Sequence, residues 1–581
     1  MNNSGYIQTA RNPDLVTCKV MSGGTELPGK YSVKSIVVEK EVNRIPYARI
    51  VVLDGSAPDQ DFKLSNENLL IPGKEIEITA GYHSEEATIF KGVVVKHNLK
   101  IKDGATYLII ECKDKAVKMT LGRKSKYFYE SKDSDIIEEL IGNSGLAAAV
   151  EATANSHQEL VQYRASDWDF MVTRAQANGK LCFVDDGTIK VAKPVLSGEG
   201  IETITFGSSV HEFEGEIDAR DQFHKITSSS WSYTDQELIA TEAQDPAIVL
   251  NGDLSPSDLA AVFGIEDLQL KHGGRLTQEE LQDWSDAKAT FQQLAKTRGR
   301  VKFQGIPSAK PGVLLTLQGL GNRFNGKIYI TGVRHEITEG NWLVDAQFGL
   351  SPTWFSETYD ISEMPGSGII PSISGLHIGV VSQLESDPDG EDRILVQIPI
   401  INNEEQGIWA RVATLDAGEN RGSFFRPEIA DEVIIGFIND DPNDAVVLGM
   451  LHSSAKPAPI VATDDNHEKG FVTRSEMKMI FNDDKISYTL QTPAGKKVIL
   501  DEDADIIKIE DEHSNVLTLS SDGITMESAG DIKIKAAGDL NLEGTNINLK
   551  ASAQFKAEGS SGSQVSSGAV TVIKGSQVKI N

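Results

Sequence analysis

Two His-Glu pairs, His211-Glu212 and His335-Glu336, are the residues whose types most directly suggest catalytic chemistry. A zinc-protease helix needs a second His four residues after the first, because that spacing places both rings on one helical face around the metal. Those positions hold Gly215 and Glu339, so neither motif is complete. We therefore expect both pairs to lie in strands, and we predict no catalytic and no metal-binding residues here.

A second near-match, Gly321-Asn-Arg-Phe-Asn-Gly-Lys-Ile328, approaches the phosphate-binding loop of nucleotide-binding proteins. Ile328 stands where that loop needs Ser or Thr for magnesium, and the residues after it follow a strand pattern instead of beginning a helix. His272-Gly-Gly274 suggests an oxyanion loop, yet no Gly-x-Ser-x-Gly nucleophile motif accompanies it. We expect neither nucleotide binding nor acyl transfer, and no cofactor.

Acidic clusters and cysteines complete the residues that could perform chemistry. Asp387-Pro-Asp-Gly390 and Asp440-Asp-Pro-Asn-Asp444 offer oxygen ligands for calcium, but Gly390 comes too early for an EF-hand loop. Such clusters most often form solvated turns. Cys18, Cys112 and Cys182 are too few and too widely spaced for a disulfide framework or a Cys-x-x-Cys site. We predict turns and reduced thiols.

Length and charge limit the class of protein. At 581 residues the chain is too long for one hydrophobic core, because single cores stop growing at about 250–300 residues. The net charge of −29 repels phosphate backbones and argues against a nucleic-acid partner. The first residues show no export signal and no run of about 18 apolar residues occurs, so we expect synthesis in the bacterial cytoplasm without a membrane span.

The pattern of the first half is mainly that of strands, with two helical stretches. From residue 31 to 102, β-branched runs are bounded by Pro and Gly, which is typical of an antiparallel barrel or sandwich. Helical periodicity appears near residues 133–180, where Ser166 is a suitable N-cap. A second helix is expected from Thr277, which has capping-box spacing to Glu280, to about Arg298 before a Gly.

A weak internal repeat divides the region before residue 360. Pro72-Gly73, a strand and Phe90-Lys-Gly92 are echoed by Pro311-Gly312, a strand and Phe324-Asn-Gly326. The repeat predicts two related β-barrels within residues 1–360, with helical insertions near 133–180 and 255–299. Segments rich in Pro and Ser then bracket a compact β-rich block, which we assign to residues 368–452, with a linker at 453–469.

Short alternating apolar pairs recur from Lys497 to the end of the chain, most of them seven to ten residues apart with Gly, Asn, Asp or Ser between them. After Val498/Leu500, the predicted core pairs of residues 470–581 are Ile507/Ile509, Leu517/Leu519, Ile524/Met526, Ile532/Ile534, Leu540/Leu542, Ile547/Leu549 and Val570/Val572. Alternation places each pair on one face of a short strand, and the turn residues let the chain change direction at every unit. This pattern predicts a β-solenoid.

One unit buries only two apolar side chains, which is too little to offset the ordering of its backbone. Three chains wound about one axis would pool these stripes and cover the strand edges. We therefore expect a homotrimeric needle, with Lys533 and Lys535 facing solvent. An ordinary β-sandwich domain is the alternative that the pattern leaves open.

The middle block carries a family resemblance. Its most distinctive residues are Trp409-Ala-Arg-Val412, Ala417-Gly418, Gly422, Phe425-Arg-Pro-Glu428, Asp431-Glu-Val433, Gly436-Phe437, Asp441-Pro442 and Val447-Leu-Gly-Met-Leu451. With these residues the chain resembles the VgrG and phage tail-spike family, most closely the spikes of extracellular contractile injection systems and of Bacteroidetes-type VI secretion. Ala430 departs from the Gly common in relatives, but a small residue still fits.

The resemblance implies a mainly β fold with some α: a hub of two barrels, an OB-fold barrel and a C-terminal triangular trimeric β-helix. It implies a non-enzymatic spike that caps the inner tube and punctures a target membrane when the sheath contracts. Implied partners are tube and baseplate proteins, effector cargo and a PAAR-type tip protein docked on Val578, Lys579, Ile580 and Asn581. The particle would be released or membrane-anchored.

Two other functions remain as alternatives. A tailspike-like carbohydrate-degrading enzyme needs paired carboxylates and aromatic platforms on its solenoid, whereas the repeats from Lys497 onward hold a single aromatic residue, Phe555. A trimeric adhesin stalk would use the same β-helix, but it needs a secretion signal and a membrane anchor. We therefore favour the puncturing spike.

Overall fold

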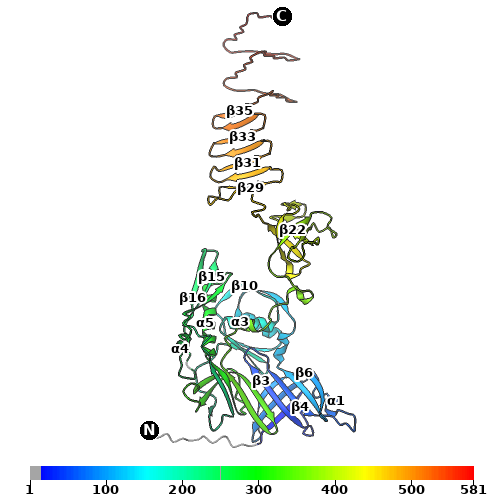
Figure 1. Cartoon of the computed structure of the whole chain (residues 1–581), viewed down its shortest axis with the longest axis vertical. Helices are drawn as coiled ribbons and strands as arrows, with labels where there is room; N and C mark the ends of the chain where they lie inside the picture. Colours follow the sequence, from blue (N-terminus) through cyan, green and yellow to red (C-terminus); the bar gives the residue numbers. More distant parts are fainter. Residues whose placement is uncertain (1–14, 249, 581) are drawn as a thin grey trace. The chain divides into compact units, whose positions relative to one another are not determined.

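The computed structural model describes residues 15–248 and 250–580. By its internal contacts the chain divides into two compact units, residues 1–373 with 439–441 and residues 374–438 with 442–581. Strands greatly outnumber helices in both (Figure 1), as the predicted mainly β fold requires. Among the described residues, no helix is long and apolar enough to cross a membrane.

A 13-stranded sheet organises the first unit. In spatial order its strands are β14 (Glu212–Ile217), β18 (Thr297–Gln304), β21 (Asn341–Phe348), β20 (Gly326–Thr338), β3 (Val33–Glu41), β4 (Tyr47–Leu53), β7 (Ala105–Lys113), β6 (Glu85–Lys102), β5 (Glu75–Tyr82), β1 (Thr17–Ser22) and β2 (Thr25–Glu26), with β19 (Leu314–Gln318) and β13 (Thr203–Thr205) branching from β20. Each half has its own core, one around Ile50 and Phe90 and one around Phe303 and Phe348. Antiparallel pairing of β3 with β20 joins the two halves into one sheet.

The repeat seen in the sequence has a structural counterpart. Gly73 and Gly312 have φ values of 92° and 91°, a left-handed conformation that favours glycine. Each Gly N–H donates to a carbonyl on the next strand, of Val94 at 2.9 Å and of Ile330 at 2.8 Å. Those two residues donate back to the residue after each Gly. The β5–β6 and β19–β20 hairpins therefore begin in the same way, as a repeat would require, while the relation of the two halves as a whole stays a prediction.

An α/β layer follows β7. It comprises η1 (Lys115–Thr120), β8 (Lys124–Lys132), α2 (Asp133–Asn143), β9 (Ala147–Val150), β10 (Ser156–Ala165), α3 (Asp167–Ala177), β11 (Leu181–Asp185) and β12 (Thr188–Ala192). The predicted N-cap is confirmed, because the Ser166 hydroxyl accepts a hydrogen bond from the Asp169 N–H at 3.1 Å. Trp168 and Met171 turn into the core under the two helices.

A second insertion lies between β14 and β18. It contains β15 (Lys225–Ser232), β16 (Glu237–Glu242), α4 (Pro256–Ala260), β17 (Asp267–His272) and α5 (Gln278–Ala295). The capping box of Thr277 and Glu280 is confirmed. The prediction that this helix reaches Arg298 is wrong, because strand β18 already begins at Thr297 and pairs with β14 and β21. Three short helices, α1 (Lys63–Asn66), α6 (Phe355–Thr358) and η2 (Pro365–Gly368), complete this unit.

The second unit begins with a closed five-stranded barrel. Its strands are β22 (His377–Gln383), β23 (Ile394–Gln397), β24 (Ile408–Val412), β28 (Ala445–Met450) and β27 (Glu432–Phe437). Val381, Ile394, Val396 and Ile435 fill its core. A small hairpin of β25 (Ala417–Gly418) and β26 (Arg421–Gly422) branches from it, and η3 (Ile438–Asp440) follows β27.

A seven-stranded antiparallel meander follows the barrel (Figure 1). Its strands are β29 (Glu468–Val472), β30 (Lys478–Asn482), β31 (Ser487–Gln491), β32 (Lys497–Asp501), β33 (Ile506–Glu510), β34 (Val516–Ser520) and β35 (Gly523–Glu527). Each pairs only with its neighbours in sequence. After β35, the described residues 528–580 form neither strands nor backbone-to-backbone hydrogen bonds within this chain.

Candidate functional site

The register of the meander aligns its side chains into two ladders. Ladder A consists of Phe471, Met479, Leu490, Val498, Ile509, Leu517 and Met526, and ladder B of Lys469, Phe481, Tyr488, Leu500, Ile507, Leu519 and Ile524. On every strand the two ladder residues are two positions apart, so both ladders project from the same face. Apart from Lys469 this face is apolar throughout, and we call it the apolar face.

This chain leaves the apolar face uncovered. From Leu448 to Ile580, none of the residues that the structure describes is buried. Ile507 and Ile509 are 44% and 47% exposed in the middle of the sheet, where an ordinary core residue would be close to zero. A groove of about 680 Å³ runs along ladder A between Leu490 and Met526. Soluble monomers rarely expose continuous apolar surface of this kind, so it marks an interaction site.

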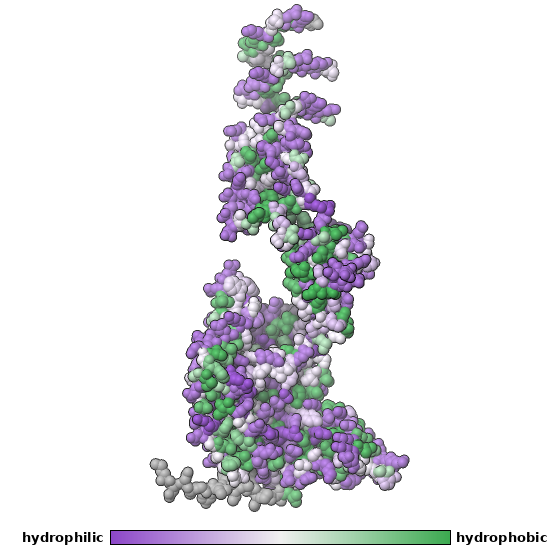
Figure 2. Space-filling model, in the orientation of Figure 1, coloured by the Kyte–Doolittle hydropathy of each residue, from purple (hydrophilic) through white to green (hydrophobic). Residues whose placement is uncertain are grey.

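The opposite face is more polar, and Figure 2 shows hydrophilic residues along both edges of the meander, where its turns lie. The central row of the opposite face holds Thr489, Lys508, Thr518 and Thr525, with Ile480 and Ile499 as the apolar exceptions. An ion pair of 3.2 Å joins the side chains of Lys497 and Glu510, and another of 2.6 Å joins Lys508 to the same carboxylate. Half-exposed ion pairs at a surface contribute little stability, but they keep charged groups on this face. The meander is thus amphipathic.

The structure places six of the predicted core residues on the apolar face: Ile507, Ile509, Leu517, Leu519, Ile524 and Met526. The others, Ile532, Ile534, Leu540, Leu542, Ile547, Leu549, Val570 and Val572, lie in the segment without strands, where each is exposed. Val578, Lys579 and Ile580 are exposed as well, and Asn581 lies outside the described residues. The burial of these side chains between chains stays a prediction.

Sequence reasoning missed the beginning of the apolar face. Phe471, Met479/Phe481 and Tyr488/Leu490 extend it upstream of Lys497. The signal was present, because these pairs alternate like the later ones and lie nine or ten residues apart. That spacing fits a five-residue strand with a tight turn, which brings the chain back antiparallel.

The barrel is fastened to the base of the meander by the segment Phe425-Arg-Pro-Glu428. The ring of Phe425 stacks on Phe471, the first member of ladder A, with centroids 5.0 Å apart and planes at 8°. The Glu428 carboxylate forms an ion pair of 2.8 Å with Arg474 on the turn after β29. Aromatic stacking of this geometry contributes roughly 0.5–1.5 kcal/mol beyond area burial.

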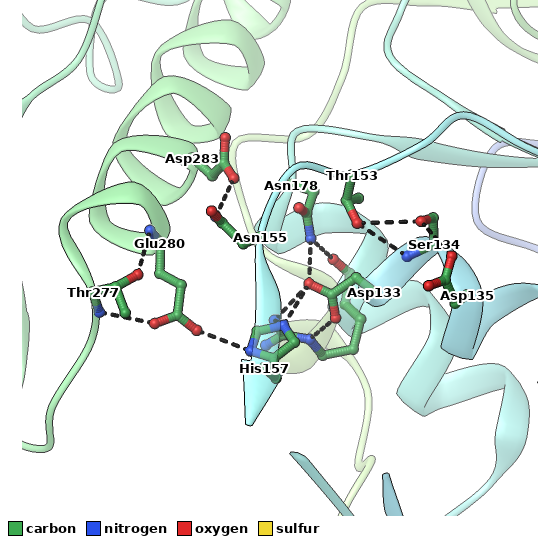
Figure 3. A network of polar contacts seen from close by, with 11 residues as sticks. Asp133, Ser134, Asp135, Thr153, Asn155, His157, Asn178, Thr277, Glu280 and Asp283 are labelled. Atoms are coloured by element: carbon green, nitrogen blue, oxygen red, sulfur yellow. Dashed lines mark hydrogen bonds and ion pairs between the residues drawn. The ribbon is translucent and has the colours of Figure 1, made fainter. Parts of the chain in front are cut away.

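A buried polar cluster in the first unit is the other candidate site (Figure 3). Arg174 on α3 forms a bidentate pair with Asp133 at the start of α2, at 2.7 and 2.9 Å. His157 on β10 lies between two carboxylates, with Nε2 3.1 Å from Asp133 and Nδ1 3.1 Å from Glu280 at the start of α5. Asn178 donates a further hydrogen bond to Asp133. Four elements meet at these side chains.

The charges of this cluster are paired, so that they hold the elements together. Hydrogen bonds to Asp133 and Glu280 raise the pKa of His157 to about 9, so the ring is protonated near neutral pH. The same contact lowers the pKa of Glu280 to about 2. Burial would raise the pKa of Asp133, but hydrogen bonds from His157 and Arg174 hold it well below its usual range. Both ring nitrogens of His157 are engaged by carboxylates, so neither can activate a nucleophile.

The remaining motifs form local structure. His335 and Glu336 lie in β20 and Glu212 begins β14, as predicted, whereas His211 lies just before that strand; burial lowers the pKa of His335 to about 3. The Asp387 carboxylate accepts hydrogen bonds from the N–H groups of Glu391 and Arg393, which confirms a turn. Across residues 15–248 and 250–580, no group of three or more His, Cys, Asp or Glu side chains is arranged to hold a metal ion.

The three cysteines are unpaired thiols, as predicted. Burial raises the pKa of Cys18 and of Cys112 to about 12, and that of Cys182 further still. Thiols with such pKa values carry almost no thiolate at neutral pH and are unreactive.

Two sequence families match the chain. The family described as Alg8 N-terminal domain matches residues 12–339. The family described as type VI secretion system/phage-baseplate injector OB domain matches residues 377–452, which contain the closed barrel. The predicted OB fold is thereby confirmed.

Curated relatives include two spike proteins. The type VI secretion system spike protein VgrG1b of Pseudomonas aeruginosa is 21% identical over 384 residues, 60% of this chain and 50% of the relative. Spike protein VgrG3 of Vibrio cholerae is 30% identical over 161 residues, 25% of this chain and 15% of the relative. The chain thus spans half or less of these relatives, and the predicted resemblance to VgrG proteins is confirmed.

Among solved structures, the 43 kDa tail protein of prophage MuSo2 from Shewanella oneidensis is similar with a TM-score of 0.44 and 12% identity, covering 58% of this chain and 98% of that protein.

Proposed function

The chain belongs to the family of the Alg8 N-terminal domain and has VgrG spike proteins as homologues, and from this premise we propose that it is the structural spike of a contractile injection system. In this role it is a homotrimer that caps the inner tube and punctures the target membrane when the sheath contracts. The first unit is the hub, the barrel is the connector, and residues 470–581 are the needle.

The observation that carries this proposal is the exposed apolar face. Three copies related by a threefold axis can turn their apolar faces inward, so that Ile507 and Ile509 pack on their symmetry mates. Each Å² of apolar surface that the three copies remove from water contributes about 25 cal/mol of stabilising free energy. A dimer with its two apolar faces packed together would cover the same ladders. In that dimer, however, residues 529–580 of each chain would have one neighbouring chain instead of two.

The segment after β35 supports the same arrangement. Its apolar pairs continue at seven- to eight-residue spacing from Ile532/Ile534 to Ile547/Leu549, whereas the meander pairs lie nine or ten residues apart up to Leu517/Leu519, after which Ile524/Met526 follows at seven. Backbone N–H and C=O groups in an ordered protein need partners, and this segment finds none in its own backbone. Winding with two other copies would supply those hydrogen bonds. The needle would then be stiff along its axis.

The role is mechanical, and we propose no catalytic residue. The cluster around Asp133, His157 and Glu280 holds helices together. Both ring nitrogens of His157 are paired with carboxylates there. The mechanical role asks for stiffness, which continuous strand pairing and an interlocked apolar core provide.

The proposed partners follow from this role. The hub binds tube and baseplate proteins, and a PAAR-type tip protein docks at the end of the needle on Val578, Lys579, Ile580 and Asn581. Effector cargo travels with the spike, and contact with the target membrane is transient. The chain is made in the bacterial cytoplasm and assembled into a particle that is released or membrane-anchored.

Light scattering of the purified full-length protein tests the proposal. One chain has a mass of 63.1 kDa, so a stable trimer has three times this mass. We expect the trimer to persist on dilution, because the needle cores are shared between chains. A stable monomer would contradict the proposal and would reopen the tailspike and adhesin alternatives.

A further inference from the structure

The β25–β26 hairpin of the barrel presents two large apolar side chains that nothing in this chain covers. Leu415 is 89% exposed and Phe424 is 85% exposed. Single exposed apolar residues are common on protein surfaces, so exposure alone has no significance. The geometry of this hairpin makes the two residues a pair.

The register of the hairpin sets the two side chains opposite one another. Ala417 pairs with Gly422. The hydrogen bond from the Ser423 N–H to the Asp416 carbonyl, at 2.9 Å, continues this pairing by one residue. A further step of the same antiparallel register places Leu415 opposite Phe424, so both project from the same face of the hairpin. They form a cross-strand apolar pair.

Polar contacts fix the shape of the hairpin. The Thr414 hydroxyl donates to the Ser423 carbonyl at 2.7 Å, and Arg421 forms an ion pair of 2.8 Å with Asp416. Gly422 has a φ of 132°, and a Cβ there would lie 2.4 Å from the Asp416 carbonyl oxygen. The backbone thus requires Gly at this position. A hairpin held in this way presents its apolar pair in one defined position.

The chain that leaves the hairpin contacts the base of the apolar face. Phe425, the residue after Phe424, stacks on Phe471, where ladder A begins. Successive side chains of an extended segment point to opposite sides. Since Phe425 turns toward its own meander, Phe424 turns away from it. The exposed pair therefore lies next to the base of the apolar face along the chain, but it faces away from the meander of its own copy and is not covered by it.

We propose that Leu415 and Phe424 clasp the base of the apolar face of a second copy of this chain, at Phe481 and its neighbours in ladder B. This inference rests on the proposed trimer, which brings the bases of three apolar faces together. Phe481 is 45% exposed and is the first apolar member of ladder B, because the position before it is Lys469. Three such contacts, one between each pair of neighbouring copies, stabilise the trimer at the junction of barrel and needle.

Photo-crosslinking tests the contact directly. The change Phe424→p-benzoylphenylalanine is introduced in the full-length protein, and the matched control is Ile400→p-benzoylphenylalanine, since Ile400 is 83% exposed on the same barrel. On irradiation we expect covalent dimers and trimers from the first variant, joined to a peptide within residues 468–491 of another copy. The control is expected to stay monomeric on a denaturing gel.

The outcomes separate the two proposals. A trimer mass by light scattering, without crosslinks from position 424, would overturn the clasp and leave the spike intact. Crosslinks of equal yield from position 400, or crosslinks only to an unrelated protein, would also overturn it. A monomer mass by light scattering before irradiation would contradict both the proposed trimer and the clasp.

A second pair of variants keeps the test independent of the probe. Leu415→Ser with Phe424→Ser should leave the barrel folded, because both side chains are exposed, while the trimer dissociates at concentrations roughly tenfold or more above the wild-type value. Ile400→Ser with Ile401→Ser is the control and should not change dissociation. Equal dissociation of wild type and both double variants would contradict the clasp.

Discussion

His157→Gln separates the charge of the buried cluster from its packing. In the folded protein the pKa of His157 is raised from 6.5 to about 9 by the carboxylates of Asp133 and Glu280. A group whose folded pKa is raised contributes stability that is fully present below its unfolded pKa and is lost as pH rises through its folded pKa. The contribution is therefore complete below pH ~6.5 and absent above pH ~9 to 10.

The size of the effect follows from the same values. A pKa difference of one corresponds to about 1.4 kcal/mol. The rise of the His157 pKa from 6.5 to about 9 therefore contributes at most about 3 kcal/mol to the free energy of unfolding. The His157 side chain is 8% exposed, so solvent screens the pair only weakly. Asp133 keeps its pairing to Arg174 in the variant, which reduces the loss. We expect Gln to lower the free energy of unfolding by roughly 2–3 kcal/mol at pH 6 and by less than about 1 kcal/mol at pH 10.

Urea unfolding followed by tryptophan fluorescence measures this difference. Five of the six tryptophans lie in the first unit, and Trp168 on α3 is buried in the core beside the cluster. Variant and wild type are compared at each pH, so that titration of other groups cancels. His513→Gln is the control, because the side chain of His513 is 75% exposed on a turn of the meander. An equal loss for His157→Gln at pH 6 and pH 10 would refute the argument, since packing and not charge would then explain it.

Four further predictions concern the needle and the fold. Ile532→Asp together with Ile534→Asp should prevent trimer formation, because each buried carboxylate costs several kcal/mol, and light scattering would show a monomer. Deletion of residues 576–581 should leave the trimer intact and abolish capture of the tip protein in a pull-down; retained capture would contradict this docking site. Thr277→Ala should lower the stability of the first unit by about 1 kcal/mol in urea, through loss of the capping box. Gly299→Ala should destabilise it by more than about 2 kcal/mol, because the new Cβ would lie 2.1 Å from a carbonyl oxygen of strand β14, and a smaller loss would show that the sheet can yield there.

Local signals in the sequence were sufficient for several elements. Ser166 and Thr277 begin helices as predicted, because an N-cap acts on N–H groups two or three residues away. Gly73 and Gly312, the two glycines of the predicted repeat, share one backbone conformation for the same reason, since each fixes its own φ locally. The alternating pairs from Ile507/Ile509 to Ile524/Met526 likewise predicted which side chains share one face. All of these features depend on residues that are close in sequence.

Other features were decided by contacts between distant segments. Helical periodicity continues to Arg298, but pairing of Thr297 and its successors with β14 and β21 converts them into a strand. The sequence also gave no indication that β3 pairs with β20, which merges the predicted barrels into one sheet. Long-range strand pairing supplies hydrogen bonds and burial that outweigh local propensity, because propensity differences are only about 1 kcal/mol per residue or less.

The two candidate sites differ in the same way. Composition and spacing alone identified the apolar pairs, but only the register of the meander showed that they form two unbroken ladders, whose first apolar members are Phe471 and Phe481. The buried cluster joins Asp133, His157 and Glu280, which are far apart in sequence and carry no common motif. Periodicity records the faces of single strands, whereas the meeting of separate elements depends on how the whole chain closes, and that information is not local.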